Sequence, residues 1–486
     1  MWDKSKIINF ALMTKNEVEL PLEFLEEISV SLGPEEARLL LRALEERPSV
    51  SIRINKAKVP SPDSFLSSFA NYAPSGVPWC KNGFYLESRP EFILDPLLHA
   101  GAYYVQEAAS MYYETIVEGL LRNFCLKGKE PLRVLDLCAA PGGKSTAILN
   151  ALAAPANPAN CPTESSDGSE TPALNDYVLV ANEYERFRAG ILRENLNKWG
   201  DPNIIITSTD ARSLGKLEDF FDIVAVDAPC SGEGMMRREP IACTQWSPRL
   251  VAQCSALQKD ILADILPALK PGGFLIYSTC TFNKSENEEN VRFLQEEYGL
   301  ELLDQPRRFM PHREKCEGLF VAVFRKPDFQ KQESFKRTTG KNKQKKIFIN
   351  APGNGLFINS ENLKFIEIGE RVCALPPAVE ETYITLVSEK IHPISAGVET
   401  GTMKGKLFVP SSRQVLSRLF DAESLPVVDL TKDEAVNYLR RQPLILPADT
   451  PKGYVCVVYD GHPLGLLKNI GNRSNNLYPQ EWRIRK

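Results

Sequence analysis

Apolar residues near the N-terminus recur at the spacing of a helix. After Pro21 they stand three or four positions apart until a glycine ends the series, at Leu22, Leu25, Ile28, Leu32 and Gly33. Pro34 opens a second helix, and the run 51–55 alternates apolar and polar residues like a half-buried strand. The stretch up to about residue 95 is mixed and rich in turns. We therefore predict an accessory domain over residues 1–95.

Between residues 96 and 326, short apolar runs alternate with helical stretches. The runs cover residues 134–137, 178–180, 204–206, 223–226, 274–277 and 319–324. Strands whose two faces are both covered by crossover helices have this continuous apolar character. The pattern predicts an α/β fold, with a doubly wound, Rossmann-like sheet over residues 96–326. Ligands bind at the carboxyl ends of the strands in such a sheet.

Two segments depart from this pattern. Residues 151–176 carry four prolines and no basic residue, which predicts a surface loop inserted into the sheet domain. Residues 327–346 are rich in lysine and arginine, and they form either a basic linker that contacts an acidic partner or a solvated tether. Beyond them, short strand-like runs joined by Gly and Pro turns predict a small intermediate domain over residues 347–415 and a β-rich module over residues 416–486.

Composition and charge exclude several classes of protein. A chain of 486 residues suits two to four domains, and 43% hydrophobic with 25% charged residues is typical of a globular protein. The 58 basic and 62 acidic residues give a net charge of −4, which excludes a uniformly basic coat for nucleic acid. The sequence contains no export signal and no run of roughly 18 apolar residues. We expect a cytoplasmic monomer with no membrane partner.

The strongest local signal runs from Val134 to Ser145, where an apolar strand enters a turn of small residues and glycines that opens a helix. Such a turn lets the backbone approach a nucleoside closely. Gly143, Lys144 and Ser145 also match the end of a phosphate-binding loop, which is the alternative. That loop needs a glycine five residues before its second glycine, where this chain has Cys138.

Acidic residues follow three of the predicted strands. Glu183, Asp210 and Asp227 come directly after the apolar runs that end near residues 180, 206 and 226. Successive carboxylates at strand ends suit ribose hydroxyls and an exocyclic amine better than phosphates. Any one of them can instead be a helix cap, but this alternative is a poor account of all three beside a glycine turn.

Two of the eleven cysteines, Cys230 and Cys280, follow buried strands and lie in polar turns. There a thiolate is favoured by neighbouring dipoles and by a cation such as Lys144, so both are candidate nucleophiles. The chain has no C-x-x-C pair, which predicts neither a disulfide framework nor a metal site. Other cysteines are predicted to be small buried residues of the core: Cys125, Cys243, Cys254, Cys316, Cys373 and Cys456.

Three separated motifs are similar to those of a known family. They are the runs 138–144, 227–232 with Gly234 and Arg237, and 277–280. Together they resemble the Nol/Nop/Sun RNA cytosine-5 methyltransferases. The runs 52–55, 103–107, 308–312 and 318–322 extend the match, and 459–465 with 476–479 resemble the PUA-like RNA-binding module of the bacterial ribosomal RNA small-subunit methyltransferase F group. The chain departs from the family at 151–176 and at Ser145, where threonine is frequent.

This resemblance implies a role for each candidate residue. Cys280 matches the nucleophile that adds to carbon 6 of cytosine, and Cys230 matches the residue that releases the product. Lys144, together with Asp227 if that carboxyl is protonated or shares a proton, would offset the charge that develops on the ring. S-adenosylmethionine would be cradled by Cys138, Ala139, Ala140, Pro141, Gly142, Gly143 and Lys144, with Glu183 at its ribose, Asp210 at its adenine and Asp227 at its methionyl end; Arg188 is an additional candidate.

The function that the resemblance implies is methylation of carbon 5 of cytosine in small-subunit (16S) ribosomal RNA. The partner is then ribosomal RNA or the small ribosomal subunit. Two alternatives stay open: a transfer-RNA cytosine-5 methyltransferase, and an RNA-binding assembly factor whose methyl transfer is vestigial. The N-terminal unit, the linker and the tail are the surfaces that would hold RNA, and the tail end is positively charged at Arg473, Arg483, Arg485 and Lys486.

Overall fold

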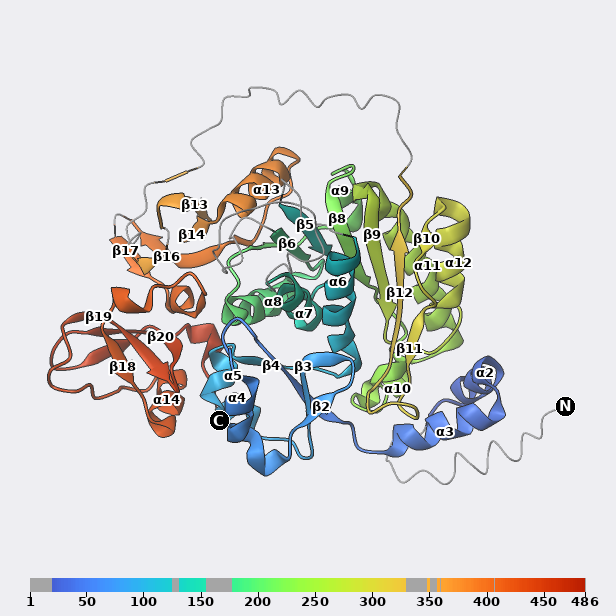
Figure 1. Cartoon of the computed structure of the whole chain (residues 1–486), viewed down its shortest axis with the longest axis horizontal. Coiled ribbons are helices and arrows are strands. Elements are labelled where there is room, and N and C mark those ends of the chain that lie inside the picture. The colour runs from blue at the N-terminus through green and yellow to red at the C-terminus, as the bar shows by residue number, and fades with distance from the viewer. Residues whose placement is uncertain are drawn as a thin grey trace.

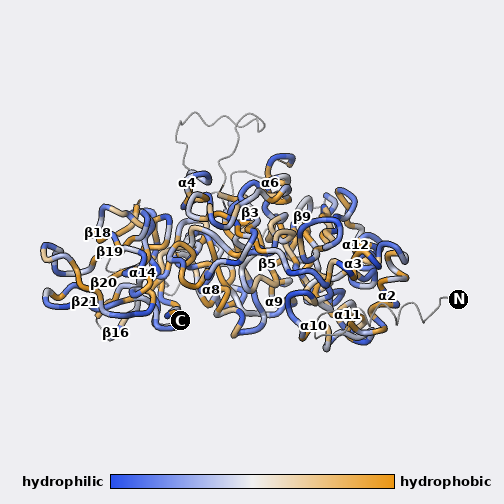
Figure 2. Tube along the Cα trace, turned by 90° about the horizontal axis from the view of Figure 1, so that it is seen from below, coloured by the Kyte–Doolittle hydropathy of each residue, from blue (hydrophilic) through white to orange (hydrophobic). Residues whose placement is uncertain are grey.

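The computed structural model describes residues 20–124, 131–153, 177–328, 348–349, 356–358, 360–405 and 407–485. Nearly all of the predicted proline-rich loop and of the basic linker lies outside the described residues, as does Cys125. In Figure 1, helices α2 (Leu22–Leu32) and α3 (Pro34–Glu45) lie at one end, a large sheet with its helices lies in the centre, and the C-terminal strands lie at the other end. Figure 2 shows the same elongated shape, with hydrophobic segments concentrated inside it.

The N-terminal strands form a sheet of their own in the order β2-β3-β1-β4. The strands are β1 (Val50–Ile54), β2 (Ser75–Val77), β3 (Cys80–Leu86) and β4 (Tyr103–Val105), with the short helices α4 (Pro62–Leu66) and α5 (Pro96–His99) beside them. The two predicted helices and the predicted strand are present. Ile52 of β1 pairs with Val105 of β4, so this sheet extends past the predicted boundary at residue 95.

Helices α2 and α3 pack against loops of the central domain. Phe24 and Ile28 are buried in one apolar cluster with Met236, Trp246 and Phe282, which belong to the loops after two central strands. The rings of Phe24 and Trp246 meet edge to face, with 5.4 Å between their centroids. The helical hairpin therefore supports these loops from outside.

The central sheet is the predicted doubly wound sheet. Its strand order is β10-β12-β9-β8-β5-β6-β7-β15, and β11 pairs with β12. The strands are β5 (Leu132–Asp136), β6 (Tyr177–Asn182), β7 (Ile204–Thr207), β8 (Phe221–Asp227), β9 (Leu269–Thr279), β10 (Glu301–Leu302), β11 (Arg307–Phe309), β12 (Leu319–Arg325) and β15 (Ser395–Ala396). Strands β5 to β9 are parallel, whereas β12 and β15 run antiparallel to their neighbours.

Helices cover both faces of the central sheet, as the continuous apolar runs predict. One face packs against α6 (Tyr112–Asn123), α7 (Gly143–Leu152) and α8 (Arg186–Trp199). The other packs against α9 (Ala211–Gly215), α11 (Pro248–Ile265), α12 (Glu288–Tyr298) and α13 (Pro377–Ser388), and α10 (Pro240–Gln245) precedes α11. Residues 151 and 152, which we assigned to the loop, instead end α7. No helix within the described ranges is long and apolar enough to span a membrane.

The C-terminal part contains two further sheets. The first has the order β13-β14-β16-β17, with β13 (Lys364–Ile368), β14 (Arg371–Leu375), β16 (Val398–Lys404) and β17 (Leu407–Pro410). The second has the order β18-β19-β20-β21, with β18 (Val427–Asp429), β19 (Gly453–Tyr459), β20 (His462–Asn469), β21 (Ser474–Asn476) and helix α14 (Lys432–Leu439). Between β14 and β16 the chain crosses to the central sheet, where Ser395 and Ala396 of β15 pair with Ile206 and Ile205.

A buried arginine joins the N-terminal sheet to the central domain. The side chain of Arg53 in β1 is fully buried, and its Nε donates to Gln106 Oε1 at 2.8 Å. Its NH2 group donates to Thr146 Oγ1 of α7 at 2.5 Å, and its guanidinium lies 4.8 Å from the ring centroid of Trp199 in α8. The run 52–55, which is part of the family resemblance, therefore helps to join the N-terminal sheet to the central domain.

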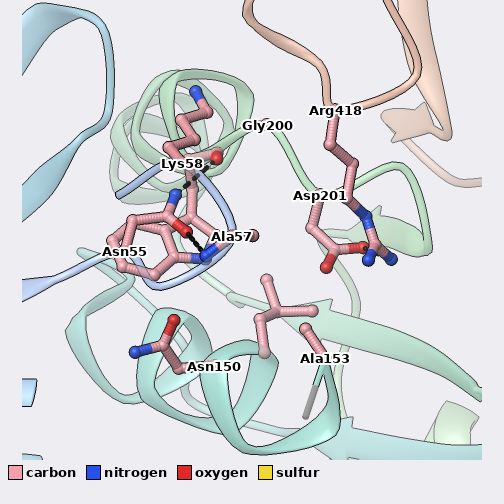
Figure 3. Close-up of a pocket in the computed structure, with 10 residues that line it drawn as sticks. Asn55, Ala57, Lys58, Asn150, Ala153, Gly200, Asp201 and Arg418 are labelled. Carbon is pink, nitrogen blue, oxygen red and sulfur yellow. Dashed lines mark hydrogen bonds and ion pairs between the residues drawn. The ribbon is translucent and has the colours of Figure 1, made fainter. Parts of the chain in front are cut away.

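The junction continues toward the C-terminal sheets around a small pocket. Figure 3 shows Asn55, Lys58, Asp201 and Arg418 around it, and its volume of about 10 Å³ is enough for one water molecule. Lys58 Nζ donates to the carbonyl oxygens of Ala100 and Lys198, each at 2.7 Å. Burial lowers the pKa of Lys58 to about 7. Polar contacts therefore tie all three parts of the chain together.

Candidate active site

The glycine turn predicted to cradle a nucleoside lies between β5 and α7. Gly142 has a φ of +115°, a conformation that favours glycine. Ala140 and Pro141 accept hydrogen bonds on their carbonyl oxygens from Arg188 NH2 at 2.9 Å and Asn195 Nδ2 at 2.8 Å, both from α8. The predicted residues 138–144 thus form one turn at the carboxyl end of the sheet, held in place by the next helix.

Asp136, the last residue of β5, was not among the predicted site residues. It is 1% exposed, and Ser145 Oγ donates to its Oδ2 at 2.6 Å. Burial, aided by the charge of Asp227, raises the pKa of Asp136 to about 7. No group in the described part of the chain donates to its Oδ1. An acidic residue at the end of the strand before the glycine turn was the signal that would have identified it.

Asp136→Asn is expected to change how the free energy of unfolding depends on pH. The pKa of the carboxyl is higher in the folded chain, about 7 against the ordinary 3.8, so its ionisation destabilises the fold as the pH rises through this window. Asn keeps an acceptor for the Ser145 hydroxyl and carries no charge. Urea unfolding should find the variant gaining stability over the parent from about pH 4 to pH 8, by up to a few kcal/mol. A stability difference that does not vary with pH would contradict this account.

The three predicted strand-end acids differ in their surroundings. Glu183 is buried, its Oε1 accepts from the Glu185 backbone at 3.0 Å, and Arg188 NH1 lies 3.4 Å from its Oε2. Asp210 caps α9, where it accepts from the backbone N and the Oγ of Ser213 at 2.8 and 3.0 Å. These bonds lower the pKa of Asp210 although burial opposes the shift. The helix-cap alternative therefore describes Asp210, but neither of the others.

Lys144 and Asp227 form an ion pair at the carboxyl end of the sheet. Lys144 Nζ lies 2.7 Å from Asp227 Oδ2, and the two side chains are 16% and 28% exposed. Burial opposes the charge of Lys144, but the carboxylate of Asp227 outweighs it and raises the pKa of the lysine. Ser278 Oγ donates to the other carboxylate oxygen, Oδ1, at 2.7 Å. The charge of Cys280 also contributes to the raised pKa of Lys144, so the cation of this pair interacts with that candidate cysteine.

The structure brings Cys230 and Cys280 together. Their Sγ atoms are 3.1 Å apart, on the loops that follow β8 and β9. The hydrogen bond with Cys280, together with burial, raises the pKa of Cys230 well above its ordinary value. The two thiols in contact therefore form one candidate site for thiol chemistry at the carboxyl end of the sheet.

Close backbone packing holds the loop of Cys230 against the loop of Cys280. The backbone N of Gly234 donates to the Cys280 carbonyl oxygen at 2.8 Å. A Cβ added at Gly234 would lie 2.7 Å from that oxygen, so the motif needs glycine here. Arg237 of the same motif donates to Glu317 Oε2 at 2.7 Å, and therefore fastens the loop to the segment before β12.

Two buried glutamates also hold these loops, and we did not identify them from the sequence. Glu286 accepts from the backbone N of Ser231 at 3.0 Å and from Gln258 Nε2 at 2.7 Å. Glu233 accepts from Trp246 Nε1 at 3.0 Å and from the backbone N of Phe282 at 2.6 Å. Each glutamate thus bridges the loop of Cys230 and the loop of Cys280, although no local pattern distinguishes it from a surface acid. Of the cysteines assigned to the core, those described are buried: Cys243, Cys254, Cys316, Cys373 and Cys456.

Comparison with protein families gives three matches along the chain. The family described as 16S rRNA methyltransferase RsmB/F matches residues 173–325. The N-terminal domain of 16S rRNA methyltransferase RsmF matches residues 20–108, and the methyltransferase RsmF PUA domain matches residues 425–484. The matches follow the N-terminal sheet, the central sheet and the last sheet in turn.

Individual proteins extend this similarity. Ribosomal RNA small subunit methyltransferase F of Enterobacter sp. (strain 638) is 30% identical over 96% of this chain and 97% of its own length. The protein of the same name from Escherichia coli (strain K12) is 30% identical over 89% of each chain. A solved methyltransferase homolog from Pyrococcus horikoshii superposes with a TM-score of 0.52 at 26% identity, over 66% of this chain and 99% of that chain.

The fold and the family resemblance inferred from the sequence are thereby confirmed. NSun6 from P. horikoshii has the same fold, with a TM-score of 0.50 at 20% identity over 63% of this chain and 98% of that chain. Three family matches and a relative at 30% identity over almost the full length lead to one assignment. The chain belongs to the RsmB/F family of 16S ribosomal RNA methyltransferases.

Proposed function

We propose that the chain methylates carbon 5 of a cytosine in 16S ribosomal RNA, with S-adenosylmethionine as methyl donor and Cys280 as nucleophile. The observation that carries the proposal is the pair of thiols 3.1 Å apart, together with Lys144, the cation paired with Asp227, which interacts electrostatically with Cys280. Carbon 5 of cytosine is a weak nucleophile, so an enzyme needs a thiolate to activate the ring and a second group to release it. The relatives named above support ribosomal RNA as the substrate.

The described residues fit S-adenosylmethionine. The buried Oδ1 of Asp136 accepts no hydrogen bond from the described residues. It could therefore accept one from the ammonium group of the cofactor. The turn 138–144 would lie along the cofactor, with Glu183 at its ribose and Asp227 toward its methionyl end. Asp210 can serve the adenine with the lone pairs that its cap bonds leave free. When bound, the cofactor supplies an electrophilic methyl group.

The chain's own residues account for the remaining steps. The Cys280 thiolate adds to carbon 6, and Lys144 offsets the negative charge that this addition places on the ring. Once Cys280 is bonded to carbon 6, Cys230 loses the hydrogen bond that most raises its pKa. Cys230 can then give its proton to solvent and take the proton from carbon 5. The bond between Cys280 and carbon 6 breaks, which restores the aromatic ring and the Cys280 thiolate.

Bisulfite sequencing of ribosomal and transfer RNA tests this proposal and its rivals. Cells that lack the gene should lose 5-methylcytosine at one or more sites of 16S ribosomal RNA, and only the active chain should restore it. Loss confined to transfer RNA would establish the first alternative substrate. Full restoration by a Cys280→Ala chain, or no loss at all, would favour an assembly factor without methyl transfer.

The C-terminal module should contribute electrostatically to RNA binding. Arg483 and Arg485 are exposed, whereas Trp482 before them and Ile484 between them are buried, so the two arginines face outward. If both contact phosphates, replacing both with Gln should flatten the slope of log affinity against log salt by about 1.5 to 2. Filter binding of a 16S fragment at several salt concentrations measures this.

A control pair keeps the total charge the same. Arg212 and Arg292 lie on α9 and α12, away from the last sheet in Figure 1, and are 80% and 65% exposed. Their replacement with Gln should leave the slope nearly unchanged. Equal slopes for the two double variants would reject a specific role for the tail.

A further inference from the structure

A chain of hydrogen bonds runs from a buried tyrosine to the candidate catalytic pair. The hydroxyl of Tyr113, on α6, lies 2.8 Å from Ser278 Oγ. Ser278 Oγ donates to Asp227 Oδ1 at 2.7 Å, and Asp227 Oδ2 lies 2.7 Å from Lys144 Nζ. Tyr113 and Ser278 are both fully buried, so solvent does not compete for the bond between them.

The direction of this chain follows from counting protons. A serine hydroxyl has one proton, and Ser278 gives it to a carboxylate oxygen, which accepts. Tyr113 must then donate its own proton to a lone pair of Ser278. Burial and the nearby Asp227 raise the pKa of Tyr113 well above its ordinary value, so the phenol keeps that proton. Every hydrogen bond in this series therefore points the same way, from Tyr113 through Ser278 to the Asp227 carboxylate.

The same tyrosine also contacts the other partner of the ion pair. Lys144 Nζ lies 5.7 Å from the centroid of the Tyr113 ring, within the range of a cation–π interaction. The hydroxyls on either side of Ser278 in β9 serve other partners: Tyr277 donates to the Glu286 carbonyl oxygen, and Thr279 donates to Asn287 Oδ1. Among the hydroxyls of Tyr277, Ser278 and Thr279, that of Ser278 is therefore the one that donates to Asp227.

We infer that Tyr113 and Ser278 are positioning residues for methyl transfer: they hold the Asp227 carboxylate in the orientation that fixes Lys144 beside the cytosine ring. This inference rests on the proposed function. Ser278 lies in β9 and Cys280 directly follows the end of that strand, so one strand and its loop would place both the nucleophile and the hydroxyl that orients Asp227. A catalytic cation must be held within a fraction of an ångström to stabilise developing charge. The hydrogen bonds from Tyr113 through Ser278 to Asp227 would hold Lys144 in this way.

The first test compares rates in variants that keep the shape of the site. Ser278→Ala removes a bond to a charged acceptor and should slow single-turnover methylation of saturating RNA by about 10- to 100-fold. Tyr113→Phe removes a bond to a neutral acceptor and should slow it by about 3- to 10-fold. Because Tyr113 acts through Ser278, adding Tyr113→Phe to Ser278→Ala should have little further effect. Ser278→Thr, which keeps the hydroxyl, should restore most of the rate.

Tyr177→Phe is the matched control. Tyr177 is also buried in the central domain, and it gives its hydroxyl proton to a buried aspartate, Asp201, at 2.6 Å. Because the acceptor of Tyr177 is charged, the loss of its hydroxyl should lower stability at least as much as the loss of the Tyr113 hydroxyl, without slowing methylation. Equal slowing in the control, or additive effects of the two site variants, would overturn the positioning role.

A second readout does not depend on turnover. Asp227 raises the pKa of Lys144, so a carboxylate held less firmly should leave more of the lysine neutral and reactive. In Tyr113→Phe and Ser278→Ala, Lys144 should react with acetic anhydride several-fold faster than in the parent at the same pH, as measured by mass spectrometry. Unchanged reactivity in both variants would reject the inference. An inactive parent with the expected Lys144 reactivities would reject only the proposed function.

Discussion

Cys230→Ala is expected to accumulate a protein–RNA adduct that survives denaturing electrophoresis, whereas Cys280→Ala forms no adduct and methylates at background. Removal of the nucleophile prevents the covalent bond from forming, although the cofactor still binds. Removal of Cys230 leaves attack and methyl transfer possible and blocks the elimination that follows. The double variant should trap nothing, because formation of the adduct precedes its release.

Cys254→Ala is the control for loss of a thiol. Cys254 is buried and belongs to neither cysteine loop, so this variant should methylate without trapping RNA. An adduct with Cys280→Ala and none with Cys230→Ala would mean that the two roles are reversed, as in the DNA cytosine methyltransferases. If neither variant trapped RNA and both still methylated, the thiol mechanism itself would be wrong.

Lys144→Met should reduce the rate of methyl transfer by about 100- to 1000-fold. The change removes the cation that offsets charge on the ring and keeps most of the apolar stem of the side chain. RNA affinity should fall much less, because one ammonium group is a single charge beside the N-terminal unit, the linker and the tail, which we expect to hold the RNA. Single-turnover rates and equilibrium binding, measured on the same preparation, separate the two effects.

Lys198→Met provides a closely matched comparison. Lys198 is 14% exposed and lies 2.6 Å from Glu194, whereas Lys144 is 16% exposed and lies 2.7 Å from Asp227. Both substitutions remove a half-buried lysine from an ion pair of the central domain. Only the change at Lys144 should greatly slow methyl transfer. Similar rates in the two variants would show that the ion pair with Asp227 is structural.

The strands that carry the candidate site were predictable because each one is visible in the sequence as a short apolar run. Strands buried on both faces need continuous apolar residues, and the turns after them carry the glycines and cysteines. The position of Cys230 and Cys280 in turns at one edge of the sheet also followed, because both come after strands of one parallel sheet. The role of Asp210 was harder to predict. Its position before a helix is as typical of a helix cap as of a ligand for the cofactor, and in the structure it caps α9 by accepting from Ser213.

The features that escaped prediction depend on contacts between distant parts of the chain. Tyr113 reaches Ser278 from a helix 165 residues earlier, and nothing in the sequence around either residue records that contact. Glu233 and Glu286 look like surface acids until the loops that they bridge are in place. β4 continues the N-terminal sheet from beyond residue 95 because sheets are built by hydrogen bonds between strands, whatever lies between them in sequence.

β15 gives the central sheet its last strand from far downstream, and this has a consequence for synthesis. β7 leaves the ribosome long before Ser395 and Ala396, so for much of translation its isoleucines border an unpaired sheet edge. Neighbouring nascent chains on one messenger RNA would carry the same edge, which invites pairing between them. Once it is made, the C-terminal segment covers this edge within the same chain, and a fragment that stops at β12 would leave the edge of β7 without β15.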